Sequence, residues 1–277
     1  MSVSIQAEAL NVEVRPSDAA LGAEIVGLDL SKPLSELECQ AVREALFAHC
    51  VIVFRNQTLT EQHQLDFSRR FGAPVVHRRP QAGDQLPGIF IVSNVVENGR
   101  AIGSLGHEEI GFHSDLAYLP LPGKYSILYA VEIPDTGGAT SWASGYAAYD
   151  ALTDDTKARL AGLRGVHRHV SEEMNPDEPT EHPLVCTHPE TGRKALFLTP
   201  LFTRAISGHE REDNRQLLAS LTEHVADPRF VYTHQWRVGD LVIWDNRCTM
   251  HRREPFAENE RRIMKRTQIM CTERPAE

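Results

Sequence analysis

Two short motifs, far apart in the chain, carry side chains that could bind one metal ion. His113 and Asp115 stand two positions apart in GFHSDLAY, within a segment that the sequence predicts to be strand. Side chains two residues apart on a strand project from the same face, about 6.5–7 Å from each other. His251 lies much later, in WDNRCTMH, directly after the predicted strand DLVIWDN. Two histidines and one carboxylate leave open coordination positions and suit non-haem Fe(II).

Each half of this set is weak by itself. His-x-Asp occurs often by chance, so His113 and Asp115 could be two polar strand residues, and His251 could be a surface-loop histidine. Competing catalytic motifs are absent from the sequence: HEEIGFH is not the HExxH of zinc proteases, and no GxGxxG, GxxxxGKS/T or GxSxG occurs. The sequence therefore contains no motif of dinucleotide-binding enzymes, P-loop enzymes or hydrolases with a nucleophile elbow.

A pair of arginines follows His251. Arg262 and Arg266 lie four residues apart in RRIMKR, and residues four apart on a strand share a face. Two guanidiniums pointing into one cavity would bind two carboxylates or comparable anions through bidentate hydrogen bonds. The alternative is a basic surface strand in which Arg261, Lys265 and Arg266 are all solvated.

The composition is that of an ordinary globular protein. The 277 residues are 41% apolar and 24% charged, so the chain can bury a sizeable core without a metal or disulfide. A net charge of −9 argues against nucleic acid or an anionic membrane as the main partner. The 5 cysteines form no CxxC pair, and no signal peptide or membrane-spanning run is visible. We expect a cytoplasmic protein.

The elements that must position these side chains are readable in outline. A capping box of Ser35 and Glu38 predicts the start of a helix, and the β-branched run at 51–54 predicts a buried strand. Thr60 opens a second predicted helix over residues 60–71.

Strands dominate the middle and the end of the sequence. Helices are predicted over 145–165 and 210–225, and PDTGGATSWAS is predicted to be a turn or loop. The acidic, proline-containing stretch 170–183 is predicted to be a surface loop, with its role as a lid left open. No repeat or linker divides the chain. We therefore expect a single domain over residues 1–277, mainly β with flanking helices.

The motifs GFHSDLAY, DTGGATSWAS, WDNRCTMHRREPF and RRIMKR, taken in order, resemble the taurine and 2,4-dichlorophenoxyacetate dioxygenase family. These enzymes are Fe(II)- and 2-oxoglutarate-dependent oxygenases. The resemblance covers nearly the whole chain, from GAEIVGLDL to the C-terminal strand. It implies a double-stranded β-helix, or jelly roll, with helical flanks.

The resemblance also implies roles for individual residues. His113, Asp115 and His251 match the iron ligands, which makes them the expected catalytic centre. Thr140, in GGAT, matches the residue whose hydroxyl contacts the distal carboxylate of 2-oxoglutarate. Arg262 matches the arginine that pairs with that carboxylate. Three protein ligands leave two positions for the 2-oxo acid and one for O2.

Residues expected at the substrate follow in the same way. Arg266 matches the arginine that binds the substrate's anionic group, and His77 matches a histidine that helps hold a sulfonate in the taurine enzymes. Glu109 stands where those enzymes carry an asparagine, so it would repel an anion or receive a cationic group. Tyr118 and the loop 170–183 also depart from the taurine-enzyme pattern.

The activity implied is hydroxylation of a C–H bond in a small anionic substrate, with succinate and CO2 as co-products. Sulfonates, sulfate esters, aryloxyalkanoates and other carboxylic acids all fit, and the resemblance implies a homo-oligomer, a dimer or a tetramer. One alternative is a catalytically silent jelly-roll protein that binds a metal or an organic acid. Another is a zinc hydrolase using the same ligands, although Thr140 and the paired arginines are surplus to that chemistry.

Overall fold

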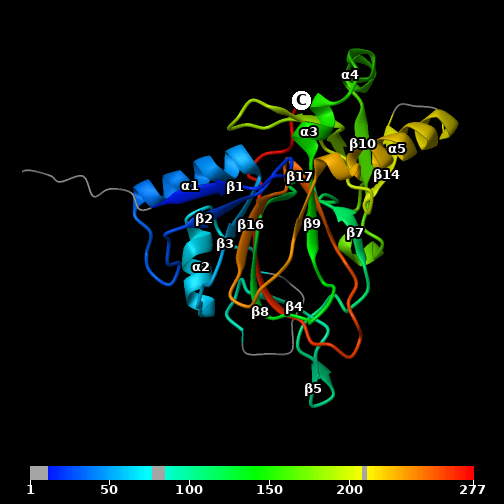
Figure 1. Ribbon diagram of the computed structural model, residues 1–277. Coiled ribbons are helices and arrows are strands. Elements are labelled where there is room, and N and C mark those ends of the chain that lie inside the picture. The colour runs from blue at the N-terminus through cyan, green and yellow to red at the C-terminus, as the bar shows by residue number, and fades with distance from the viewer. Residues whose placement is uncertain (1–11, 77–84, 208–210) are drawn as a thin grey trace, which may run out of the picture.

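Two facing β-sheets form the centre of the protein, as the computed structural model shows for residues 12–76, 85–207 and 211–277 (Figure 1). The larger sheet has seven strands in the order β1 (Glu13–Pro16), β2 (Ala23–Val26), β3 (Val51–Phe54), β16 (Leu241–Asp245), β8 (Gly123–Glu132), β18 (Ile263–Met270) and β4 (Phe90–Ser93). The smaller sheet has four strands in the order β15 (Val231–His234), β9 (Thr140–Ser144), β17 (Thr249–Arg253) and β7 (Ile110–His113).

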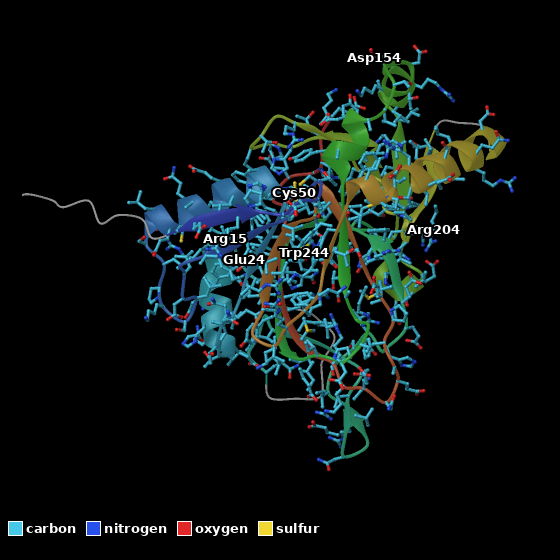
Figure 2. The ribbon with its side chains drawn as sticks, in the orientation of Figure 1. Arg15, Glu24, Cys50, Asp154, Arg204 and Trp244 are labelled. Carbon is cyan, nitrogen blue, oxygen red and sulfur yellow. The ribbon has the colours of Figure 1, made fainter. Side chains whose placement is uncertain are left out.

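All neighbouring strands in both sheets are antiparallel except β2 and β3. The sheets pack through aromatic side chains, because Trp142 on β9 and Trp244 on β16 belong to one buried cluster and their ring centroids lie 5.4 Å apart. Trp244 accordingly lies deep between the sheets, whereas Arg15, Asp154 and Arg204 lie at the periphery (Figure 2). This arrangement confirms the predicted jelly roll.

Helices cover the outer faces of both sheets (Figure 1). The helices α1 (Glu36–His49) and α2 (Glu61–Arg69) bury their apolar sides against the larger sheet. The helices α3 (Gly145–Asp150) and α5 (Arg211–Val225) do the same for the smaller sheet. The helices do not cover the inner faces, so a site can lie between the two sheets.

Further short elements lie outside the two main sheets. They are α4 (Asp154–Leu160), the paired strands β10 (Arg164–His167), β11 (Thr180–Pro183) and β14 (Thr203–Ser207), the pair β12 (Val185–Thr187) and β13 (Lys194–Leu196), the hairpin β5 (Val96–Glu97) and β6 (Arg100–Ala101), and two 3-10 turns at Glu172–Met174 and Pro228–Phe230. No helix in the described ranges has both the length and the apolar character needed to cross a membrane.

Local sequence signals account for the first elements. The Ser35 hydroxyl accepts a hydrogen bond from the Glu38 amide, and the Glu38 carboxylate accepts one from the Ser35 amide, which confirms the capping box. Thr60 caps α2 as predicted. The run at 51–54 is a fully buried strand, as its β-branched composition predicts.

Three predictions about elements need correction. The helix expected over 145–165 is two helices followed by a strand, because the Thr153 side chain caps a new helix after α3 has ended. The loop expected in PDTGGATSWAS ends before β9, whose five residues are all buried. The loop expected over 170–183 ends in β11, which pairs with β10. In the second and third cases packing outweighs the local turn residues.

Removing the N-cap of α1 tests how firmly this helix is fixed. Ser35→Ala deletes the acceptor for the Glu38 amide, so we expect a loss of about 1 kcal/mol in the free energy of unfolding. Urea denaturation measures it. Thr58→Ala, in an exposed loop position, is the control and should change little. Equal stability of the two variants would contradict the capping account.

Candidate metal and co-substrate site

Three potential metal ligands converge at the strand pair β7 and β17 of the smaller sheet. His113 ends β7 and His251 lies in the middle of β17, and the antiparallel register places the two opposite each other with ring centroids 4.2 Å apart. The Nε2 atoms of His113 and His251 lie 3.9 Å from Oδ1 and Oδ2 of Asp115, respectively. One ligand atom from each residue falls within 4.8 Å of the others, which is close enough for one divalent ion.

Asp115 reaches this position by a route that differs from the prediction. The strand ends at His113, so Asp115 is not a second residue on the same strand face but lies in the following turn, where Leu116 has a φ of 58°. The Asp115 carbonyl accepts a hydrogen bond from the Gly123 amide at 3.0 Å. This turn folds the carboxylate back toward the imidazoles. The turn, and not a shared strand face, therefore brings Asp115 close to His113.

A network of side chains fixes the Asp115 carboxylate. The Ser126 hydroxyl donates to Oδ2 at 2.5 Å, and the Asn246 amide donates to the Ser126 hydroxyl at 3.1 Å. The Asn246 side-chain oxygen accepts from the Asp115 amide and from the Trp244 indole. Asn246 belongs to the tight turn between β16 and β17, so it ties Asp115 to the strand that carries His251. The sequence predicts this turn but gives no signal for the role of Asn246 or Ser126.

The protonation states of the three residues suit a metal ion. Burial alone would raise the pKa of Asp115, but the Arg266 guanidinium, 3.4 Å from Oδ1, and the two imidazoles hold it well below its usual range. Burial lowers the pKa of His251 to about 3 and also lowers that of His113. His113 is oriented by a hydrogen bond of 2.8 Å between Nδ1 and the Gly111 carbonyl, which leaves Nε2 available to bind a metal ion. At neutral pH the set is two neutral imidazoles and one carboxylate, the combination that non-haem iron requires.

A second buried group, His188, Asp245 and Cys248, has comparable spacing but a different character. The Asp245 carboxylate already accepts hydrogen bonds from Arg247 and from His188 Nε2 at 3.0 Å. Burial, the largest cause, raises the pKa of the Cys248 thiol well above its ordinary value and keeps it protonated. This group is internally paired, so its hydrogen bonds indicate a structural role.

A cavity opens beside the ligands, between the two sheets. Its lining consists of Val92, Leu105, Ile110, His113, Leu128, Thr140, Trp244, His251, Arg253, Arg262 and Arg266. Thr140, Arg262 and Arg266 were expected at the site, and all three line the cavity. Arg262 lies just before β18, and Arg266 lies within it. Both residues line this cavity, although the pairing of β18 with β8 shifts register after Ile263. Arg253 is an addition that the sequence analysis did not single out.

Arg262 provides the test of whether an anionic co-substrate fits. Its side chain is 2% exposed, and within the described ranges it forms no ion pair and its Nε has no hydrogen-bond partner. Burial and the nearby charge of Arg253 lower the pKa of Arg262 to about 9. The Trp236 indole donates to the Thr140 hydroxyl at 2.9 Å, which leaves the hydroxyl hydrogen for a ligand. A buried guanidinium without a counter-ion beside an oriented hydroxyl fits a carboxylate.

Comparison with known proteins identifies the family. The family model described as "Taurine catabolism dioxygenase TauD, TfdA family" matches residues 13–268. The chain belongs to this family. A family relative, the alpha-ketoglutarate-dependent 2,4-dichlorophenoxyacetate dioxygenase of Burkholderia sp. (strain RASC), is 34% identical over 88% of this chain and 89% of its own. Alpha-ketoglutarate is a synonym of 2-oxoglutarate.

Solved structures agree with this placement. A taurine dioxygenase from Burkholderia xenovorans superposes with a TM-score of 0.82 at 34% identity, covering 94% of this chain and 91% of that one. AAD-2, solved in complex with Mn(II) and N-oxalylglycine, also has a TM-score of 0.82 at 34% identity, covering 96% and 99% of the two chains. As a member of the TauD/TfdA family, the protein is a non-haem iron dioxygenase that depends on 2-oxoglutarate.

Of the other residues expected at the substrate, Glu109 and Tyr118 are not among those that line the cavity in the described part of the chain. Glu109 is exposed and does not line the cavity. Tyr118 is buried against Phe202, whose ring also contacts His113, so Tyr118 lies one ring away from the ligands. His77 lies outside the described residues.

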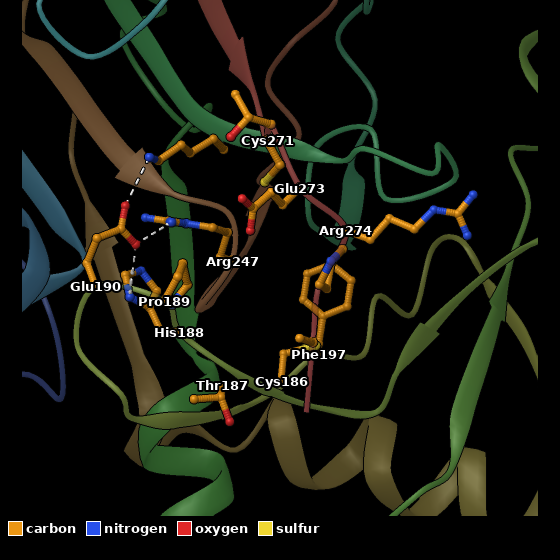
Figure 3. Close-up of a pocket in the computed structure, with 14 residues that line it drawn as sticks. Cys186, Thr187, His188, Pro189, Glu190, Phe197, Arg247, Cys271, Glu273 and Arg274 are labelled. Carbon is orange, nitrogen blue, oxygen red and sulfur yellow. Dashed lines mark hydrogen bonds and ion pairs between the residues drawn. The ribbon is translucent and has the colours of Figure 1, made fainter.

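A larger cavity, of about 350 Å³, lies elsewhere in this TauD/TfdA family member and shares no lining residue with the first. Its buried and half-buried charged side chains are paired with one another: the Glu190 carboxylate contacts Lys124 at 3.0 Å and Arg247 at 2.6 Å (Figure 3). Size alone would favour this cavity, but unpaired buried charge and ligand geometry favour the one between the sheets.

The Ser126 hydroxyl offers a direct test of the network around Asp115. Ser126→Ala removes the hydrogen bond that orients the carboxylate, so we expect Mn(II) affinity to fall about tenfold or more in equilibrium dialysis. Ser141→Ala is the matched control, because Ser141 is also buried and its hydroxyl is hydrogen-bonded, to that of Thr233, but it lies on β9 in the smaller sheet. An unchanged affinity in Ser126→Ala would show that Asp115 does not need this support.

Proposed function

We propose that His113, Asp115 and His251 hold Fe(II) and form the catalytic centre of this dioxygenase. The observation that carries the proposal is their convergence on one point, in the protonation states that metal ligation needs, beside a buried and unpaired guanidinium. The ligand chemistry of two imidazoles and one carboxylate fits iron, and zinc hydrolysis would leave Arg262 without a task.

We assign the distal carboxylate of 2-oxoglutarate to Arg262 and Thr140. Both side chains line the cavity that contains the two histidines. N-oxalylglycine, present in the structure of AAD-2, differs from 2-oxoglutarate only by an NH group in place of a CH2 group, and this likeness supports the assignment. Arg262 supplies the counter-charge and Thr140 a hydroxyl donor that Trp236 holds in place.

When bound, Fe(II), 2-oxoglutarate and O2 supply an oxidative decarboxylation that yields succinate and CO2 and hydroxylates a substrate C–H. The chain's own contribution is positioning and shielding. Val92, Ile110 and Leu128 give the cavity apolar walls that exclude water. Asp115 stays ionised because Ser126 and Arg266 stabilise its negative charge.

We propose a small anionic organic compound as the substrate, bound through Arg266. Arg266 lines the cavity and its guanidinium lies 3.4 Å from Asp115, so an anion on its other side would be held within reach of the metal. Sulfonates, sulfate esters, aryloxyalkanoates and other carboxylic acids share the necessary charge. His77, Glu109 and Tyr118 stay predictions for the substrate side of the site.

We further propose that the protein acts in the cytoplasm as a homo-oligomer on free small molecules, rather than on nucleic acid or a membrane. Its net charge of −9 and its 5 cysteines, all buried free thiols, support this setting. The oligomer, a dimer or tetramer, rests on the family resemblance alone.

Succinate formation tests the proposed function. The protein, loaded with Fe(II) without oxygen, receives 2-oxoglutarate, O2 and a panel of sulfonates, sulfate esters and aryloxy acids. We expect succinate production that one class of compound stimulates, because hydroxylation is coupled to decarboxylation. If the protein binds iron and 2-oxoglutarate but no compound stimulates turnover, the panel lacks the substrate. Failure to bind either ligand would contradict the proposed function.

Substitution of Arg262 and of Arg266 should each weaken the binding of a different ligand. Arg262→Ala should raise the KM for 2-oxoglutarate about tenfold to 100-fold, because a charge-assisted hydrogen-bonded pair is lost, with a smaller effect on the primary substrate. Arg266→Ala should do the reverse. Arg261→Ala, an exposed neighbour paired with Glu132, is the control and should change neither. Equal effects of Arg262→Ala and Arg266→Ala on both ligands would contradict the assigned roles.

A further inference from the structure

Arg253 is a buried cation at the site, and the function proposed above assigns it no role. It lies on β17 directly opposite Thr140 of β9, and its side chain is among those that line the cavity. The residue is 6% exposed, and within the described ranges it forms no ion pair. An arginine in this position needs a reason, because an uncompensated buried charge is costly.

The donors of Arg253 reach across to the segment before β7. One terminal nitrogen donates to the Leu105 carbonyl at 2.8 Å, and the other donates to the Glu108 carbonyl. The amide of Phe256, whose ring lies under the Arg253 guanidinium, donates to the His107 carbonyl at 3.2 Å. Residues 105–108, which we call the rim loop, are thereby fastened to the strand that carries His251.

The rim loop borders the cavity directly. Leu105 lines the cavity while remaining 44% exposed, so it stands where the cavity meets solvent. Leu105 also has a φ of 70°, an unfavourable conformation for a residue other than glycine, and the bonds to Arg253 help to hold the loop in it. The position of this loop therefore affects access to the cavity.

Arg253 is also electrostatically linked to the co-substrate subsite. Arg253 and Arg262 line the same cavity, and within the described ranges neither of them forms an ion pair. Two buried like charges that line one cavity repel each other, and an anion bound in that cavity relieves the repulsion. A carboxylate bound to Arg262 would stabilise Arg253 in its present position as well.

We propose that Arg253 is a positioning residue that couples occupation of the anion subsite at Arg262 to fastening of the rim loop over the cavity. The proposal rests on the proposed assignment of 2-oxoglutarate to Arg262. Binding of the dicarboxylate favours the conformation in which Arg253 holds Leu105 and Glu108. By thermodynamic reciprocity, loss of that hold weakens 2-oxoglutarate binding. The primary substrate then meets a cavity whose rim the co-substrate has already ordered.

Hydrogen exchange in the Mn(II)-loaded protein, with and without 2-oxoglutarate, tests the coupling. In the wild type we expect 2-oxoglutarate to slow amide exchange in residues 105–108 several-fold. In Arg253→Gln we expect fast exchange there regardless of 2-oxoglutarate. The dissociation constant for 2-oxoglutarate, from calorimetry, should rise about tenfold, within the usual range of coupling between sites.

Two further variants make the result specific. Arg252→Gln removes the adjacent arginine, which stacks over Phe112 at 5.1 Å, and should behave as the wild type in both measurements. Arg253→Lys keeps the charge but loses one of the two terminal nitrogens that bond the rim loop, so amide exchange in residues 105–108 should be intermediate. This variant serves as the test if Arg253→Gln folds poorly.

The outcomes separate the coupling from the proposed function. If Arg253→Gln keeps 2-oxoglutarate-dependent protection of the rim loop, or binds 2-oxoglutarate within twofold of the wild type, the coupling is overturned and the function stands. If the wild type itself fails to bind 2-oxoglutarate, the proposed function and the coupling are overturned together.

Discussion

The structure of the site depends on one buried carboxylate, that of Asp115, held where the two sheets meet. It would be costly there without compensation, since burial disfavours the ionised form. Ser126, Arg266 and the Asn246 turn provide that compensation from three separate strands or turns of the larger sheet and its connection to β17. The carboxylate is therefore placed by the whole sandwich, and the two imidazoles of the smaller sheet meet it across the gap.

Charge imbalance distinguishes this site from the rest of the interior. Around Asp245, each charged group has an opposite partner, so His188 and Arg247 complete a closed structural network. By contrast, Arg253, Arg262 and Arg266 line the cavity beside Asp115, and no Asp or Glu is among its lining residues in the described part of the chain. Neither Arg262 nor Arg253 forms an ion pair within the described ranges. A buried excess of positive charge is a stable arrangement only if anions occupy it. This excess explains why the cavity suits a dicarboxylate and an anionic substrate together.

The sequence predicts this site more completely than it predicts the elements that build it. Ordered motifs identify the family, and the family resemblance predicts the three ligands, because the type of each side chain is read directly from the sequence. The path of Asp115 is different: the strand ends at His113 because a turn bonded to Gly123 and Asn246 takes over, and such long-range bonds have no local signal. The same holds for β9, where packing against Trp244 makes a strand of residues that follow a glycine-rich turn.

Arg253 shows a further limit of reading a sequence alone. In HRRE it looks like one of several adjacent basic residues, and only the register of β17 against β9 places it beside Thr140 rather than in solvent. Strand alternation assigns Arg252 and Arg253 to opposite faces, but it does not say which face is the interior. Tertiary pairing decides that, and with it which of the two arginines can affect the site.

Metal stoichiometry in matched variants tests the central claim most directly. Fe(II) or Mn(II) bound per chain would be measured by equilibrium dialysis and elemental analysis for the wild type, His251→Gln and His188→Gln. The account predicts one ion per chain in the wild type and in His188→Gln, and loss of binding in His251→Gln. Stoichiometric binding retained in His251→Gln, or lost in a folded His188→Gln, would contradict it and place the metal elsewhere.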